Sequence, residues 1–351
     1  MLMFAAGRHR HDEGCMRRRD FLGLVASVTA AWPVTTYAQQ QGATRRIGYL
    51  DYGAGVLPNG EFAPFYDVYR RKPFLEGLRD RGWVEGQNVT IERRFAAGQA
   101  DRLPALAAEL VALNVQVIVA AATPAAMAAR NATDKIAIVM VDPGDAVELG
   151  LVTSLARPGA NITGVTSLAP ELATKRLGLL KEGFPKTAQV AVLWNSAIPP
   201  AEVALKELRT AAPMLGLELH LMEVKGAPRL ADMLAALKRE GADALFVFPD
   251  PLMFGNRDSI VSFANKNSIP ALFGAREFVE AGGLMSYGAD YPAMFQRAGH
   301  YVGRILNGER PADLPVERPT KLDLIINLKT AKAFGFDIAP MLLAHADEII
   351  E

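Results

Sequence analysis

Seven polar or aromatic side chains end or follow short apolar runs of the kind that form strands in parallel sheets. They are Tyr52, Thr123, Asp142, Trp194, Asn195, Asp250 and Tyr287. In open α/β sheets, ligands bind beyond the carboxyl ends of the strands. We therefore expect these side chains to converge on one cleft, and their mixture of types suits a small zwitterionic or polyfunctional molecule.

The residue types suggest how such a molecule would be held. The Thr123 hydroxyl, together with free backbone N–H groups at the start of the following helix, would hold a carboxylate. Asp142 or Asp250 would accept hydrogen bonds from an ammonium group, and the aromatic rings would cover an apolar side chain. The competing explanation is helix capping and turn formation, which Asp, Asn, Ser and Pro commonly serve.

The sequence motifs of the common α/β enzymes are missing from this chain. It contains no Gly-x-Ser-x-Gly nucleophile elbow and no Gly-x-x-x-x-Gly-Lys-Ser/Thr phosphate loop. After the glycines of residues 53–55, Pro58 stands where the dinucleotide fingerprint needs its third glycine. The histidines lack the spacing of metal ligands, so we expect no metal and no cofactor. A secreted hydrolase that uses Asp142 and Asp250 as an acid–base pair is the alternative class.

The elements that would position these residues alternate along the chain. Ten apolar, β-rich runs predict strands at residues 47–50, 89–93, 115–121, 136–141, 162–166, 190–194, 217–224, 244–248, 271–273 and 284–287. Helical periodicity lies between them, at residues 73–81, 102–113, 171–182, 202–215, 229–240 and 294–306. Alternating strands and helices predict parallel sheets with right-handed crossovers. Two sheets of roughly five strands each fit this pattern better than one large sheet, and the division is expected near residues 157–159.

The N-terminal residues predict that the protein is exported. Arg17, Arg18 and Arg19 precede a Phe-Leu pair and a short apolar stretch, as in a twin-arginine signal. Small residues before Gln39 form a cleavage site, so residues 1–38 are interpreted as an upstream segment and signal peptide. The apolar stretch is too short to span a bilayer permanently. An ordinary first helix is the competing interpretation.

The composition limits the partners of the processed chain. Residues 1–38 contain five basic and three acidic side chains out of 38 of each, which leaves a net charge of about −2. This balance offers no footprint for a polyanion, so nucleic acid is not an expected partner. The single cysteine, Cys15, precedes the apolar stretch. The processed chain would therefore have no disulfide and no thiol nucleophile.

Several motifs together carry a family resemblance. They are residues 74–83 (FLEGLRDRGW), 86–89 (GQNV), 156–164 (ARPGANITG), 278–288 (FVEAGGLMSYG), 314–321 (LPVERPTK) and 326–332 (INLKTAK). They resemble the substrate-binding proteins of ABC transporters, in particular the tryptophan-binding (TrpX-like) group, over essentially the whole processed chain. The chain departs from the family at Asp51 and Tyr52, where members often carry a small hydroxyl residue.

The resemblance implies an α/β fold with two Rossmann-like lobes, whose parallel sheets are joined by a hinge: the type I periplasmic-binding-protein fold. It places residues 45–160 and 288–310 in lobe 1. Residues 165–284 would form lobe 2, with the C-terminal segment 311–351 crossing back. The positions that match the cleft motifs of the family are Thr123, Pro124, Asp142, Pro143, Asn195, Asp250, Tyr287 and Gly288.

The resemblance also implies a role. A periplasmic protein, expected to be a monomer, would capture a small molecule between its lobes and deliver it to an ABC permease in the inner membrane. The ligand would bias the hinge towards closure through better contacts in the closed state. A ligand-occupied sensor that docks on a receptor would use the same cleft, and the sequence leaves both roles open.

Overall fold

The computed structural model describes residues 44–166, 169–224 and 227–351. The predicted upstream segment and export signal, residues 1–38, lie outside the described residues. Residues 44–351 form one compact unit. Within the described part of the chain, no helix has both the length and the apolar character needed to cross a membrane.

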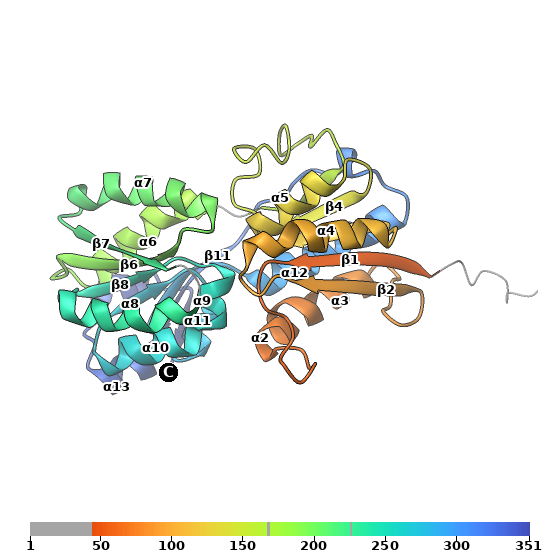
Figure 1. The fold of residues 1–351 in the computed structure, drawn as a ribbon. Coiled ribbons are helices and arrows are strands. Elements are labelled where there is room, and N and C mark those ends of the chain that lie inside the picture. Colours follow the sequence, from red (N-terminus) through yellow and green to blue (C-terminus); the bar gives the residue numbers. More distant parts are fainter. Residues whose placement is uncertain (1–43, 167–168, 225–226) are drawn as a thin grey trace, which may run out of the picture. The chain divides into compact units, whose positions relative to one another are not determined.

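The first sheet is wholly parallel, with the strand order β2-β1-β3-β4-β5 (Figure 1). Its strands are β1 (Arg45–Asp51), β2 (Val89–Phe95), β3 (Val117–Ala121), β4 (Ala137–Val141) and β5 (Ile162–Val165). Every residue of β3 and β4 is buried, because helices cover both faces of the sheet. This burial explains the continuous apolar runs in the sequence.

The second sheet has the order β12-β11-β10-β9-β8-β6-β7 and is parallel except where β10 pairs with β11. Its strands are β6 (Gln189–Asn195), β7 (Glu218–Val224), β8 (Ala244–Val247), β9 (Ala271–Phe273), β10 (Met285–Ala289), β11 (Leu322–Asn327) and β12 (Glu348–Ile350). All ten strands that the sequence predicts are present. The expectation of five strands in each sheet is wrong for this sheet, because the C-terminal segment adds β11 and β12.

Helices pack on both faces of each sheet. Their bounds are α2 (Pro64–Tyr66), α3 (Lys72–Arg79), α4 (Leu103–Ala112), α5 (Thr123–Ala132), α6 (Ala169–Gly183), α7 (Pro199–Met214), α8 (Ala227–Glu240), α9 (Pro251–Gly255), α10 (Arg257–Lys266), α11 (Arg276–Glu280), α12 (Tyr291–Leu306), α13 (Leu328–Phe334) and α14 (Pro340–Ala344). In β3, Val117 and Val119 share a core with α3 and α12, whereas Ile118 and Ala120 share another with α4 and α5. The alternation of strand side chains thus builds a separate core on each face.

The chain returns to the first sheet through α12. This helix follows β10 of the second sheet, yet it packs along α3 and against β3, β4 and β5. Two glycines allow the helix backbones to approach: a Cβ on Gly77 would lie 1.9 Å from Gln296 O, and one on Gly299 would lie 2.3 Å from Phe74 O. Residues 288 and 289, which the expected boundary assigned to lobe 1, lie in β10.

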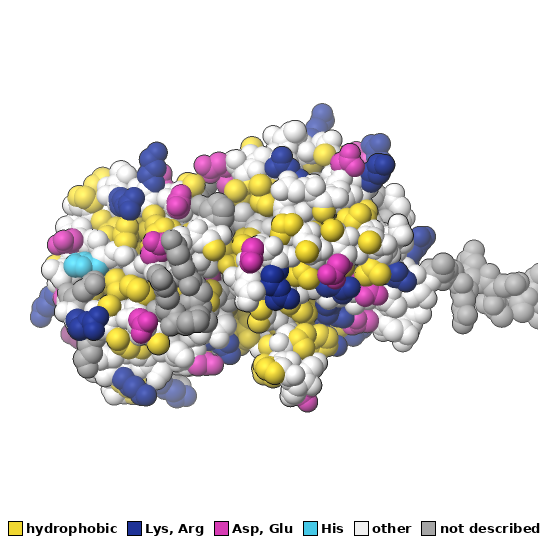
Figure 2. Space-filling model, in the orientation of Figure 1, with side chains coloured by type: hydrophobic (Ala, Val, Ile, Leu, Met, Phe, Trp, Pro, Cys, Tyr) yellow, Lys and Arg dark blue, Asp and Glu magenta, His cyan; other side chains and the backbone are white. Residues whose placement is uncertain are grey.

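Contacts also join the helices of the two sheets. Phe65, from α2, stacks on Phe254, from α9, with ring centroids 5.1 Å apart. The Tyr69 hydroxyl donates a hydrogen bond to Glu280 at the end of α11, at 2.5 Å. On the face shown in Figure 2, acidic and basic side chains are interspersed, so neither sign of charge dominates it.

Candidate functional site

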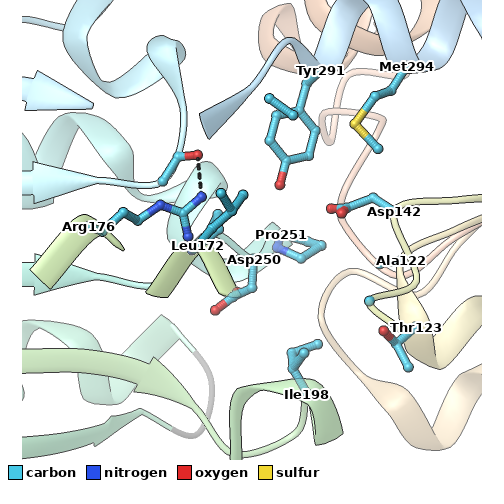
Figure 3. A pocket seen from close by; sticks show the side chains of 14 residues that line it. Ala122, Thr123, Asp142, Leu172, Arg176, Ile198, Asp250, Pro251, Tyr291 and Met294 are labelled. Atoms are coloured by element: carbon cyan, nitrogen blue, oxygen red, sulfur yellow. Dashed lines mark hydrogen bonds between the residues drawn. The ribbon is translucent and has the colours of Figure 1, made fainter. Parts of the chain in front are cut away.

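A pocket lies where carboxyl ends of strands from both sheets meet (Figure 3). From the first sheet, the segments after β3 and β4 contribute Ala122, Thr123, Asp142 and Gly144. Helix α12 adds Tyr291 and Met294. Figure 3 shows the Asp142 carboxylate and the Tyr291 hydroxyl directed into the space between the walls.

The opposite wall comes from the second sheet and its helices. The segments after β8 and β9 contribute residues 249–251 and Gly274, and Ala289 lies at the end of β10. Leu172 and Arg176 project from α6, and Ile198 precedes α7. The pocket therefore combines carboxylates, a guanidinium and hydroxyls with apolar side chains, which is the composition typical of a small-molecule site.

The first wall is built on backbone conformations that residues other than glycine rarely adopt. Ala122 has φ 71° and ψ 160°, and Asp142 has φ 55°. Hydrogen bonds hold both residues in place: Ala122 N donates to Val141 O and Asp142 N to Val165 O, each at 2.9 Å. These bonds place Thr123 at the start of α5 and Asp142 at the rim of β4.

The Thr123 hydroxyl has a partner within the protein. Its Oγ1 donates to Pro143 O at 2.5 Å, and the residue is buried. Since a hydroxyl has one proton to donate, this bond leaves none for a ligand carboxylate. The hydroxyl donor role expected from the sequence therefore does not hold in this structure. The next residue, Pro124, contributes no backbone N–H to the helix start.

Asp250 caps α9 and is buried at the base of the pocket. Its Oδ1 accepts hydrogen bonds from Leu252 N at 2.6 Å and from Met253 N at 3.2 Å. Burial raises the pKa of Asp250 to about 6, although these amides and the Asn195 side chain favour the charged form. Its Oδ2 and the Asn195 Nδ2 have no hydrogen-bond partner of good geometry in the described structure. Asp250 is thus both a cap and a carboxylate with acceptor capacity to spare.

Arg176 is a site residue that the sequence analysis missed. Its Nε donates to Tyr287 O at 2.6 Å and its Nη2 to Gly274 O at 3.2 Å, and the residue is 3% exposed. Burial lowers the pKa of Arg176 to about 10, against the opposing influence of Tyr291 and Asp142. The sequence did hold a signal: Arg176 falls on the buried stripe of α6 with Ala173 and Leu177, where a charge is unexpected.

Tyr291, at the start of α12, was also missed. Burial first, and then the charge of Asp142, raise the pKa of Tyr291 well above its ordinary value. Its ring packs edge-on against Phe254, with centroids 5.1 Å apart. It follows Asp290, which caps α12 by accepting from Ala293 N at 2.9 Å. The cap fixes the helix start and so sets where the Tyr291 hydroxyl enters the pocket.

The structure brings three of the predicted residues into the pocket lining: Thr123, Asp142 and Asp250. Five others are not part of the lining but are neighbours of residues that are. They are Tyr52, Pro143, Asn195, Tyr287 and Gly288. Gly288 permits a close approach, since a Cβ there would lie 2.0 Å from Gly274 O. Pro124 and Trp194 do not line the pocket, and Trp194 packs beside the core of the second sheet.

The family model described as "ABC transporter substrate binding protein" matches residues 68–350. The chain belongs to this family. A tyrosine-binding protein of Clostridioides difficile (strain R20291) is 29% identical over 263 residues, which are 75% of each chain. This match confirms the resemblance drawn from the motifs.

Solved structures of similar proteins agree with the assignment. A domain from Streptococcus pneumonia in complex with L-Trp is 26% identical, with a TM-score of 0.77 over 88% of this chain and 100% of that one. A ligand-free, open substrate-binding protein from Clostridium difficile is 25% identical, with a TM-score of 0.59 over 88% and 99%. The family consists of transporter substrate-binding proteins and not of enzymes, so the hydrolase alternative is not supported. The α/β fold of two mostly parallel sheets is that of type I periplasmic binding proteins.

Proposed function

We propose that this substrate-binding protein serves an ABC importer outside the cytoplasm, where it captures a small amino-acid-like molecule in the pocket between its two sheets. The observation that carries the proposal is the lining itself, to which both sheets contribute. A ligand that contacts Asp142 on one wall and Asp250 on the other stabilises the arrangement in which both walls reach it. This is the physical basis of hinge closure, which a permease would recognise.

The chemistry of the walls favours a zwitterion with an apolar side chain. Asp142 and Asp250 supply acceptors for an ammonium group. Leu172, Ile198 and Met294 supply apolar surface for the rest of the ligand. The tryptophan and tyrosine ligands of the relatives have this composition.

The proposal also includes export of the chain and delivery of the ligand to a permease. The twin-arginine pattern at Arg17–Arg19 would direct the chain out of the cytoplasm, and cleavage before Gln39 would release a periplasmic monomer. Delivery would be to an ABC permease in the inner membrane, with no cofactor and no chemical step.

We expect at least one L-amino acid to bind and to raise the melting temperature. A ligand at one hundred times its dissociation constant adds about 2.7 kcal/mol to the free energy of unfolding, or roughly 5 °C for a domain of this size. Thermal melting against the twenty L-amino acids, followed by calorimetric titration of those that shift the curve, measures this. Asp142→Asn should lose the shift, whereas Asp145→Asn, three residues along the same loop and outside the lining, should keep it. No shift with any amino acid would contradict the proposal.

A further inference from the structure

Arg176 is a buried cation whose hydrogen bonds within the protein are incomplete. Two backbone carbonyls, Tyr287 O and Gly274 O, accept from its Nε and Nη2. Its Nη1 is buried and has no hydrogen-bond partner among the described residues. Arg176 lines the pocket on the wall opposite Asp142 (Figure 3). A ligand in the pocket would therefore lie beside the guanidinium, which still has a donor without a partner.

Donating hydrogen bonds to these two backbone carbonyls does not require a guanidinium. The two carbonyls are neutral, and no acidic side chain forms an ion pair with Arg176 within the described residues. A buried charge that lacks a counter-ion and a full set of hydrogen bonds is unfavourable, so protein interiors retain such groups mainly where a ligand completes them. A guanidinium also has the planar fork of donors that fits a carboxylate.

We propose that Arg176 binds a carboxylate of the ligand through Nη1, so that the pocket selects molecules that carry a carboxylate. This inference rests on the proposed function and adds the residue that selects for the carboxylate of the ligand. The competing anion site, the start of α5, is weaker. There the Thr123 hydroxyl proton is already donated to Pro143 O, and Pro124 removes one backbone donor.

Charge selection follows from this arrangement. An amino acid places its carboxylate on Arg176, and its ammonium group lies near Asp142 or Asp250. The corresponding amine keeps the ammonium group and the side chain but leaves Nη1 buried and unpaired. Truncating one partner of a buried charge pair weakens binding by about 30-fold or more. We expect the wild-type protein to prefer the acid over the amine by at least that factor.

The test compares matched ligands by calorimetric titration of the purified protein. L-tryptophan and L-tyrosine are paired with tryptamine and tyramine, and every other amino acid that binds is paired with its decarboxylated amine. Arg176→Gln removes the charge and keeps a donor for the carbonyls. Arg176→Lys keeps the charge. Lys175→Gln is the matched control, because it makes the same charge change at the neighbouring exposed position of α6.

The proposal predicts that Arg176→Gln brings acid and amine to similar affinities, that Arg176→Lys retains part of the preference, and that Lys175→Gln leaves it unchanged. A purely structural role would change both affinities together and leave their ratio intact. Amines that bind the wild-type protein as tightly as the acids, or an unchanged ratio in Arg176→Gln, would overturn the inference while leaving the proposed function standing. Binding of no amino acid and no amine would overturn both.

Discussion

Replacing Asp51 with Asn is expected to lower the free energy of unfolding by about 3–5 kcal/mol, because it breaks a buried ion pair and leaves one charge behind. Asp51 ends β1 and is 1% exposed. Both of its carboxylate oxygens accept hydrogen bonds from Arg70 Nη1, at 2.9 Å and 2.8 Å, and Oδ1 also accepts from Gly53 N at 2.7 Å. Burial alone would lower the pKa of Arg70, but the Asp51 carboxylate raises it.

Urea denaturation at pH 7 measures the loss in the free energy of unfolding. Two further variants show whether the buried ion pair is its cause. Asp67→Asn is the matched control, because its pairs with Arg71 and Lys72 are at the surface and should contribute less than about 1 kcal/mol. The double variant Asp51→Asn/Arg70→Met removes both charges and should recover part of the stability. If Asp51→Asn and Asp67→Asn lowered the free energy of unfolding equally, the role assigned to Asp51 would be contradicted.

Lowering the pH from 8 to 5 is expected to stabilise the ligand-free protein. Burial raises the pKa of Asp250 to about 6 and that of Glu277 to about 7, from ordinary values of 3.8 and 4.5. Glu277 is 1% exposed, and neither of its carboxylate oxygens has a hydrogen-bond partner in the described structure. A carboxyl group whose pKa is raised on folding takes up its proton more readily in the folded state, so stability grows as the pH falls through that range. One pKa unit is worth about 1.4 kcal/mol, and pH 5 lies about one unit below the pKa of Asp250 and about two below that of Glu277, so together they add on the order of 4 kcal/mol between pH 8 and pH 5.

Neutral substitutions test the two carboxylates separately. Glu277→Gln and Asp250→Asn should each raise the melting temperature at pH 8 and flatten its dependence on pH. Glu280 lies on the same helix as Glu277 but is exposed, and it accepts a hydrogen bond from Tyr69. Glu280→Gln should therefore not raise the melting temperature. Asp67 and Glu317, whose pKa values are lowered by Lys72 and Arg297, lose their contributions only below the chosen range. A melting temperature that falls steadily from pH 8 to pH 5 would contradict the prediction.

The fold was largely predictable from the sequence because most strands are buried on both faces. A strand such as β3 or β4 has to be apolar at consecutive positions, and that signal is local. The strands β11 and β12 lacked it: β11 carries Asp323, and β12 has three residues that are exposed or half-buried. Their place in the sheet depends on β10, with which β11 pairs in antiparallel orientation. Pairing between strands depends on the folded chain, so the local sequence of β11 and β12 did not predict it.

The pocket was predictable only where its residues follow strands. Thr123, Asp142 and Asp250 could be found because the carboxyl ends of parallel strands share one edge of a sheet. Arg176 and Tyr291 come from helices, and Tyr291 reaches the pocket because α12 crosses from the second sheet to the first. Nothing local to residue 291 encodes that crossing. Glycines such as Gly77 and Gly299 permit it, and their role becomes visible only when the two helices are seen together.

A crystal structure of the protein grown with the amino acid that binds it most tightly would show directly where the ligand lies. We expect the ligand to occupy the pocket of Figure 3, with its ammonium group near Asp142 or Asp250 and its carboxylate on Arg176. A saturated crystal in which this pocket is empty and the ligand lies elsewhere on the chain would contradict it.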